Sequence, residues 1–94
     1  MLASEEINEK SDIFLKALTL KAAEDIESIK NDVTKKMIVI LRVTPLAQTD
    51  SLELKEAIEK LYEFSASIGG DIARLGEERI VITPPGVKVW RGSP

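Results

Sequence analysis

Apolar residues change their spacing several times along the chain, and each change indicates a new structural element. The stretch DIFLKAL (12–18) is rich in Ile, Phe and Leu and predicts a β-strand. After it, apolar residues recur every three or four positions with charged residues between them, which predicts an amphipathic helix. The apolar stripe of this first helix comprises Leu20, Ala23, Ile26, Ile29 and Val33.

The next segment, MIVILRV (37–43), is an almost unbroken apolar run with several β-branched residues. Such a run predicts a central strand that is covered on both faces. Pro45 should end this strand, because proline cannot donate a hydrogen bond to a β-ladder.

A second helix is predicted between Asp50 and Gly69. Asp50 can cap its first turn, Glu53 three residues later resembles the second half of a capping box, and Gly69 provides a stop signal. The apolar stripe of this second helix comprises Leu54, Ala57, Ile58, Leu61, Phe64 and Ile68.

Three short strands follow: DIARL (71–75), RIVIT (79–83) and VKVW (87–90). The residues GEE between the first two favour a hairpin, and PPG before the third favours a turn in which Gly86 takes a positive φ. The chain is therefore predicted to be a single α/β domain of order β-α-β-α-β-β-β, with two helices packed on a sheet of about five strands.

The predicted strands are apolar on both sides, which has a consequence for assembly. Met37, Val39 and Leu41 would face one way, whereas Ile38 and Ile40 would face the other. Two amphipathic helices can cover about one face of five strands. If both lie on the same face, the opposite face needs a partner, and we expect a homodimer. If they lie on opposite faces, this argument weakens.

Composition excludes several classes of function. The chain has 94 residues, of which 44% are hydrophobic and 31% are charged, as expected of one globular domain. Its net charge of −3 argues against nucleic acid as a partner, because phosphate binding requires a basic surface. Cysteine and histidine are both absent, which removes thiolate nucleophiles, imidazole bases and the usual zinc ligands.

The remaining polar residues do not form a recognisable catalytic set. The acidic residues fall on the predicted polar faces of helices and at turn tips, where charged side chains are normally solvated. Gly69, Gly70 and Gly76 follow a helix and precede a strand, the reverse of the order in a phosphate-binding loop. We therefore predict no catalytic residue, no metal, no cofactor and no enzymatic activity. Gly70 either forms a plain turn or marks the close approach of another backbone.

The quoted segments resemble the SepF cell-division proteins, in particular their archaeal SepF-like branch. The resemblance rests on IGGDIARLGEERIVITPPGVKVW, together with DIFLKALTL, MIVILRVTPLA and LYEFSASIGG in the same order. It divides the chain into a polar lead-in (1–11), a SepF-like core (12–90) and a tail or cloning remnant (91–94).

The resemblance implies a function that composition and spacing do not. It implies a dimeric α/β sandwich, with both helices on one side of the sheet, that binds the C-terminal tail of the tubulin-like protein FtsZ. Such an adaptor would link the division ring to the inner face of the cell membrane, on the cytoplasmic side. Family members carry an N-terminal amphipathic anchor, whereas MLASEEINEK has too few apolar residues for one. We expect membrane contact only through an anchor that is not evident in this chain.

The resemblance also implies site residues. Phe64 near the end of the second helix would be an apolar anchor for the FtsZ tail, supported by Ile68, with Lys60 and Arg74 meeting acidic residues. Phe64 as an ordinary core residue is the alternative. Gly69, Gly70 and Ile72 would take part in self-association, so a lysine at Gly70 should disturb assembly more than folding. Polymerisation of the dimers is left open.

Two other functions fit the same pattern. One is a dimeric small-ligand sensory domain that binds its ligand at the glycine turn between 69 and 72. The other is a structural oligomerisation module with no affinity for the FtsZ tail.

Overall fold

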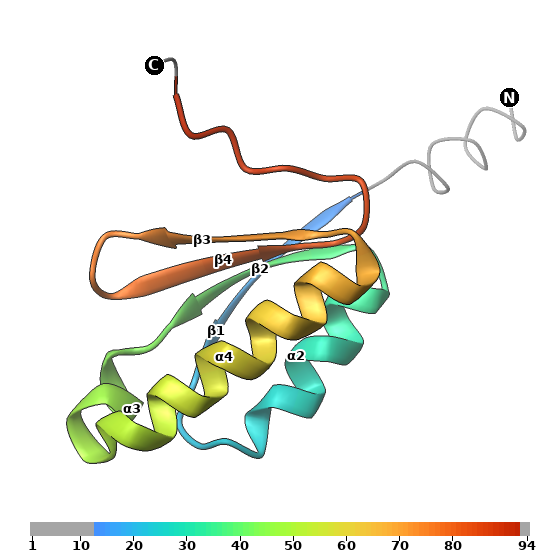
Figure 1. Cartoon of the computed structure of the whole chain (residues 1–94). Coiled ribbons are helices and arrows are strands. Elements are labelled where there is room, and N and C mark those ends of the chain that lie inside the picture. Colours follow the sequence, from blue (N-terminus) through green and yellow to red (C-terminus); the bar gives the residue numbers. More distant parts are fainter. Residues whose placement is uncertain (1–12, 93–94) are drawn as a thin grey trace, which may run out of the picture.

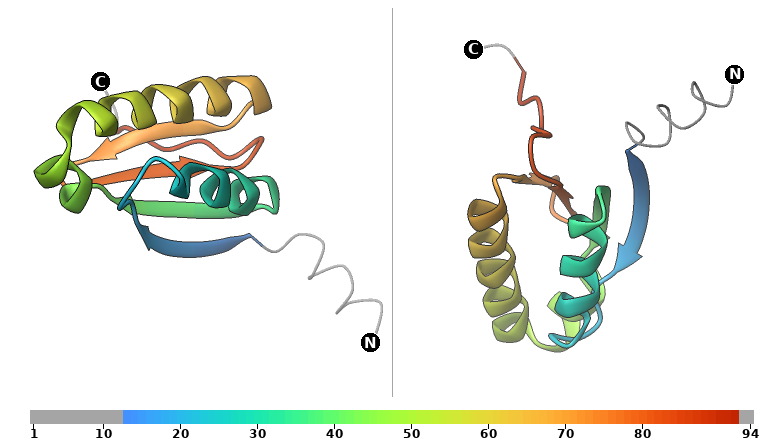
Figure 2. Two further views of the ribbon diagram at one scale, coloured as in Figure 1. Left: turned by 90° about the horizontal axis from the view of Figure 1, so that it is seen from below. Right: turned by 90° about the vertical axis from the view of Figure 1, so that its right-hand side faces the viewer.

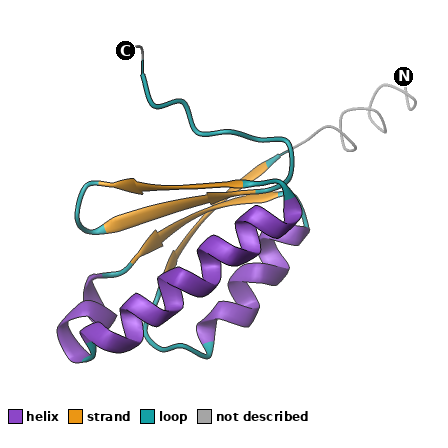
Figure 3. Ribbon diagram, in the orientation of Figure 1, coloured by secondary structure: helices purple, strands orange, loops and turns teal. Residues whose placement is uncertain are grey.

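A computed structural model describes residues 13–92, which form a four-stranded sheet with three helices on one face (Figure 1). Figure 3 shows the two layers by type of element. The predicted α/β class and the packing of the helices on one face are confirmed. The elements in chain order are β1 (Phe14–Thr19), α2 (Asp25–Thr34), β2 (Met37–Arg42), α3 (Thr44–Thr49), α4 (Ser51–Ile68), β3 (Asp71–Leu75) and β4 (Arg79–Thr83).

The sheet is mixed, with the strand order β1-β2-β4-β3. β1 and β2 run parallel and are connected through α2, whereas β4 pairs antiparallel with both β2 and β3. The register aligns Ala17 with Ile40, Ile40 with Val81, and Val81 with Ala73. This row of apolar side chains crosses all four strands.

The beginning of α2 differs from the prediction. Leu20 and Ala23 belong to the predicted stripe but precede the helix, and Leu20 is fully buried. The Asp25 carboxylate accepts hydrogen bonds from the backbone N–H groups of Lys21 (2.9 Å) and Ala22 (3.1 Å), which stabilises the turn at this helix end.

Both predicted ends of α4 are confirmed. The Asp50 carboxylate accepts a hydrogen bond from the backbone N–H of Glu53 (3.0 Å), and Gly69 ends the helix with φ 74°. The Glu53 side chain does not complete a capping box. Its carboxylate instead accepts a hydrogen bond from the backbone N–H of Ala23 (2.7 Å), which ties α4 to the start of α2.

The short helix α3 was not predicted. Pro45 does end β2, but it also lies in the first turn of α3. Backbone N–H groups in the first turn of a helix have no intrahelical acceptor, so proline, which lacks an N–H, is tolerated there. A proline after a strand therefore signalled both the end of the strand and the start of a helix.

The predicted strand VKVW (87–90) is not formed, so the sheet has four strands within residues 13–92. The GEE hairpin between β3 and β4 and the positive φ of Gly86 (83°) are confirmed. After this turn the chain passes back beside the start of β3, held by side-chain hydrogen bonds and not by a β-ladder.

The core lies between the sheet and the helices. Its central side chains come from alternate positions of β2 and β4 and from the inner faces of α2 and α4. The largest fully buried apolar side chains include Leu20, Ile29, Val33, Val39, Leu41, Leu61, Ile80 and Ile82.

The opposite side of the sheet, which we call the helix-free face, is also apolar. Its side chains alternate with those of the core along each strand. Leu15 is 66% exposed on β1 and Leu75 is 44% exposed on β3, whereas Val81 in the centre is buried. The apolar residues of the helix-free face are Leu15, Ala17, Ile38, Ile40, Ala73, Leu75 and Val81.

Candidate functional site

A groove runs between α4 and β3, the edge strand on that side of the sheet. Leu54 and Ile58 are partly buried side chains of α4 that pack against the core, and Tyr62 continues the same side of the helix with 54% of its surface exposed. Arg74 of β3 lies opposite them. The residues that line this α4–β3 groove are Ser51, Leu54, Lys55, Ile58, Glu59, Tyr62 and Arg74.

A second hollow continues from the groove past Tyr62 and Arg74 towards the C-terminal segment. It adds Leu75, Trp90 and Arg91, of which Trp90 is 77% exposed. Tyr, Trp and Arg are the residue types that most often dominate binding energy at protein interfaces. The two hollows together offer apolar contacts beside cationic side chains.

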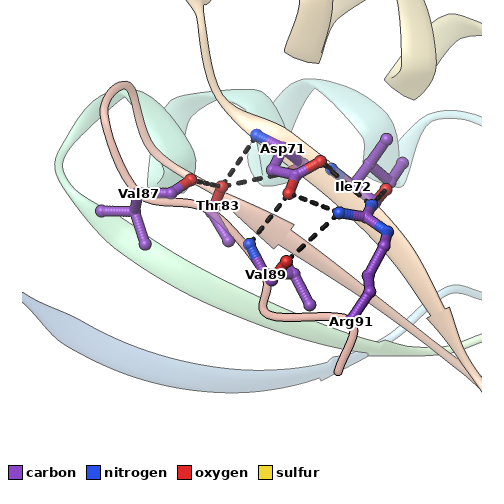
Figure 4. A network of polar contacts seen from close by, with 6 residues as sticks. All are labelled: Asp71, Ile72, Thr83, Val87, Val89 and Arg91. Atoms are coloured by element: carbon purple, nitrogen blue, oxygen red, sulfur yellow. Dashed lines mark hydrogen bonds and ion pairs between the residues drawn. The ribbon is translucent and has the colours of Figure 1, made fainter. Parts of the chain in front are cut away.

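The wall of this second hollow is fixed by the polar network in Figure 4. The Asp71 carboxylate accepts two hydrogen bonds from the Arg91 guanidinium and one from the backbone N–H of Val89 (2.8 Å). Arg91 also donates to the carbonyl of Ile72 (2.9 Å), and the Thr83 hydroxyl donates to the carbonyl of Val87 (2.6 Å). The network holds the C-terminal segment against β3 and β4.

Electrostatics reinforce the same contact. Hydrogen bonds from the Arg91 guanidinium and the Val89 N–H hold the pKa of Asp71 well below its usual range. The Asp71 carboxylate in turn raises the pKa of Arg91. Both groups therefore stay charged across the physiological pH range.

The four residues predicted to bind a partner are not brought together. Phe64 and Ile68 are partly buried and pack against the core, and the ammonium group of Lys30 on α2 lies 5.5 Å from the centroid of the Phe64 ring. Phe64 therefore faces α2. Tyr62, two positions earlier, lies about 160° away around the helix, on the side of the groove. Of the predicted four, only Arg74 lines the α4–β3 groove.

Lys60 is exposed on α4 and lies outside both hollows. Its predicted contact with a partner stays a prediction.

The three residues predicted for self-association have clear positions within the fold. Gly69 is the C-cap of α4, and Ile72 is a core residue with 6% exposure. A Cβ on Gly70 would overlap the carbonyl oxygen of Thr83, so the close backbone approach is to the chain's own β4. The structure thus gives Gly70 a role in folding, and a role in self-association stays a prediction.

Sequence reasoning missed Tyr62 as a site residue. Leu54 and Ile58 were recognised as members of the apolar stripe but not as groove residues. Tyr62 could have been recognised because it is an aromatic residue at the border of the apolar stripe. A side chain at that position is partly exposed, and an exposed aromatic ring often belongs to a binding surface.

Within residues 13–92, no three acidic, histidine or cysteine side chains are grouped so as to hold a metal ion. In the same range, no helix combines the length and the apolar character that crossing a membrane requires.

These features define a two-layer α/β domain whose distinctive surfaces suit the binding of protein segments. The family described as Cell division protein SepF matches residues 15–89. A curated Cell division protein SepF from Haloferax volcanii is 32% identical over 68 residues, which cover 72% of this chain and 57% of that protein. The chain belongs to the SepF family. It spans little more than half the length of this curated relative.

Solved structures of related proteins have the same fold. A SepF-like protein from Archaeoglobus fulgidus aligns with a TM-score of 0.81 at 24% identity, over 87% of this chain and 98% of the other. A SepF-like protein from Pyrococcus furiosus aligns with a TM-score of 0.76 at 28% identity, over 85% and 96% of the two chains. SepF from Methanobrevibacter smithii, solved in complex with FtsZ-CTD, aligns with a TM-score of 0.73 at 24% identity, over 83% and 98%.

Proposed function

We propose that this domain is a cell-division adaptor that forms a homodimer and binds the C-terminal tail of FtsZ, linking the division ring to the membrane. Membership of the SepF family supports the role in division. The complex of the Methanobrevibacter smithii relative with FtsZ-CTD supports the choice of partner. The α4–β3 groove is the observation that carries the proposal in this chain, because it offers an apolar surface beside an exposed cation.

The tail would lie along the groove in an extended or helical form. Apolar residues of the tail would pack on Leu54, Ile58 and the ring of Tyr62. Within residues 13–92 the Arg74 guanidinium donates one long hydrogen bond, to the carbonyl of Glu77 (3.4 Å), and Arg74 is exposed, so it can pair with an acidic residue of the tail. An exposed pair of this kind contributes under about 1 kcal/mol, so the apolar contacts supply most of the affinity.

Titration of a labelled peptide copied from the C-terminus of the host's FtsZ tests this assignment. Tyr62→Ala should weaken binding about tenfold, because it removes a large exposed aromatic contact. Arg74→Glu should weaken binding and reduce its dependence on salt. Glu56→Ala is the matched control, because Glu56 is an exposed residue of the same helix outside both hollows. Unchanged affinity in both groove variants would move the site elsewhere, and no binding by the wild-type chain would remove the function.

The homodimer would form through the helix-free face. Its apolar row of Ala17, Ile40, Val81 and Ala73 crosses the whole sheet and has no helix over it. Val81 at the centre of the row is buried, but Ala17 is exposed and Ile40 and Ala73 are partly exposed. Together with the exposed Leu15 and Leu75 they form an apolar surface that monomeric proteins seldom leave uncovered. Ile40→Glu should therefore disrupt the contact through this face and shift sedimentation velocity towards the monomer in dilute solution, while the circular dichroism spectrum is unchanged.

The proposed location is the cytoplasmic side of the cell membrane at the division site. Co-sedimentation of the chain with lipid vesicles, with and without the FtsZ peptide, measures whether these residues reach the membrane themselves or through a further segment or partner.

A further inference from the structure

The outer edge of β1 has no neighbouring strand within the described part of the chain. β1 is the first strand of the sheet order, and among the described strands it pairs with β2 alone. Five of its six residues are exposed. In Figure 2, β1 (blue) lies at the margin of the sheet in both views, with neither helix covering its outer side.

The backbone groups that point to this open edge can be identified from the hydrogen bonds at both ends of β1. The N–H of Phe14 donates to the carbonyl of Lys36 (3.4 Å), and the N–H of Leu20 donates to the carbonyl of Arg42 (2.9 Å). Even-numbered residues therefore bond to β2. Because orientation alternates along a strand, the N–H and C=O groups of Leu15, Ala17 and Thr19 point outwards.

Natural sheet edges are usually protected by proline, by inward-pointing charges or by a bulge. β1 contains no proline and no acidic residue. Its one charged side chain, Lys16, points to the helix side of the sheet, where an ion pair with the Asp32 carboxylate of α2 (3.0 Å) neutralises its charge. Lys16 therefore does not protect the outer edge as an unpaired inward-pointing charge would. The start of the strand is apolar and open, with Phe14 58% and Leu15 66% exposed. This edge can therefore accept another strand.

We propose that β1 pairs antiparallel with β1 of a second copy of this chain, with Ala17 opposite Ala17. In this register the outward residues of both copies meet, Leu15 lies opposite Thr19, and Lys16 lies opposite Leu18. A register centred on Lys16 would place two like charges directly opposite each other, which is unfavourable. A register centred on Leu15 would place Ala17 opposite Ile13, which precedes β1, and Thr19 opposite a residue outside the described range. Charge and hydrogen bonding thus select the register centred on Ala17.

The twofold axis of this pairing is perpendicular to the sheet, so the helices of both copies stay on one side. The helix-free faces then join into one wider apolar surface. This contact is independent of FtsZ binding and distinct from pairing through the helix-free face, because it uses backbone groups of the edge. A pair of six-residue strands is marginal by itself. It would therefore act as a weak second contact between dimers, and two different self-contacts allow assembly beyond the dimer.

Cysteine cross-linking tests the register directly, since the chain has no native cysteine. In a hydrogen-bonded antiparallel pair, opposite Cα atoms are about 5.5 Å apart, which is within the range of a disulfide. Ala17→Cys should give a disulfide-linked dimer on mild oxidation. Ala47→Cys, at an exposed position on α3, is the matched control and should stay monomeric on a non-reducing gel. Equal, low cross-linking in the two variants would overturn the proposal.

Ala17 also lies on the helix-free face, so the experiment is repeated in the Ile40→Glu background, which disrupts that face. Cross-linking should persist there, and its loss would assign the contact to the face and overturn the edge proposal. Ala17→Pro removes the outward N–H without touching the ladder to β2. Adding Ala17→Pro to Ile40→Glu should abolish the remaining association in sedimentation velocity. The cross-linking result stands by itself if the proline variant does not fold.

Discussion

Arg91 binds both carboxylate oxygens of Asp71, twenty positions earlier in the chain, with nitrogen–oxygen distances of 3.0 and 3.1 Å. The pairing is bidentate, the geometry in which an Arg–carboxylate contact is strongest. It joins the C-terminal segment to the first residue of β3. Trp90 and the wall of the second hollow depend on this contact for their position.

The depressed pKa of Asp71 predicts a specific pH dependence of stability. A carboxyl whose folded pKa lies below its unfolded value of about 3.9 stabilises the fold above that value, and the stabilisation is lost as the pH falls towards the folded pKa. The melting temperature should therefore fall as the pH drops below about 4. In Asp71→Asn the melting temperature should be lower at pH 7, and the difference from wild type should shrink with acidification. A constant difference between pH 7 and pH 3 would contradict this reading.

Gly70 should be more sensitive to substitution than Gly69, although the two are adjacent. Gly70→Ala places a Cβ against the carbonyl oxygen of Thr83, a backbone atom that cannot move without disturbing β4. We expect a loss of about 1 to 3 kcal/mol in the free energy of unfolding. Gly69→Ala meets no atom within 4 Å and costs about 1 kcal/mol through its positive φ. Urea denaturation of both variants measures the difference, and equal losses would show that the Thr83 contact is relaxed in solution.

The N-cap of α4 should contribute measurably to stability. Asp50→Ala removes the acceptor for the N–H of Glu53 and should lower the free energy of unfolding by about 1 kcal/mol. Glu56→Ala, an exposed change in the same helix, is the control and should have an effect within about 0.5 kcal/mol. Thermal melts followed by circular dichroism distinguish the two. An Asp50→Ala variant as stable as its control would show that water replaces the cap without loss.

Alanine substitutions at Phe64 and Tyr62 should have different effects on stability and on peptide binding. Phe64→Ala removes a half-buried ring that packs against the core, so we expect a loss of about 2 kcal/mol, less than for a fully buried phenylalanine. Peptide affinity of the folded fraction should change little. Tyr62→Ala should show the opposite pattern, with a small change in melting temperature and weaker peptide binding. The reverse outcome would restore Phe64 as the docking residue that the sequence indicated.

The sequence predicted most of the fold because its signals were local. The apolar run of β2, the cap and stop of α4 and the positive φ of Gly86 each depend on a few neighbouring residues. The segment 87–90 has the composition of a strand, but the hydrogen bonds of Asp71 hold it beside β3 outside the sheet. Pairing across eighteen or twenty positions cannot be recognised from spacing alone.

The candidate site was predicted less well for a related reason. The apolar stripe of a helix shows which side chains face the core. It does not show which neighbouring helix or strand lies on each side of that stripe. Phe64 is next to α2 and Tyr62 next to β3 only because of the way α4 lies across the sheet. The ion pair between Lys16 and Asp32 likewise depends on the packing of α2 over β1.

The strand order has a consequence for how the domain reaches its native state. Among residues 13–92, β4 is the last strand in sequence but lies between β2 and β3, so within this range it supplies the only ladder that joins the two halves of the sheet. Until Arg79–Thr83 is available, β3 has no strand to pair with, and β1 and β2 form an isolated parallel pair. The chain therefore has no partial sheet that is stable by itself, and folding should be a single cooperative transition that waits for its final strand.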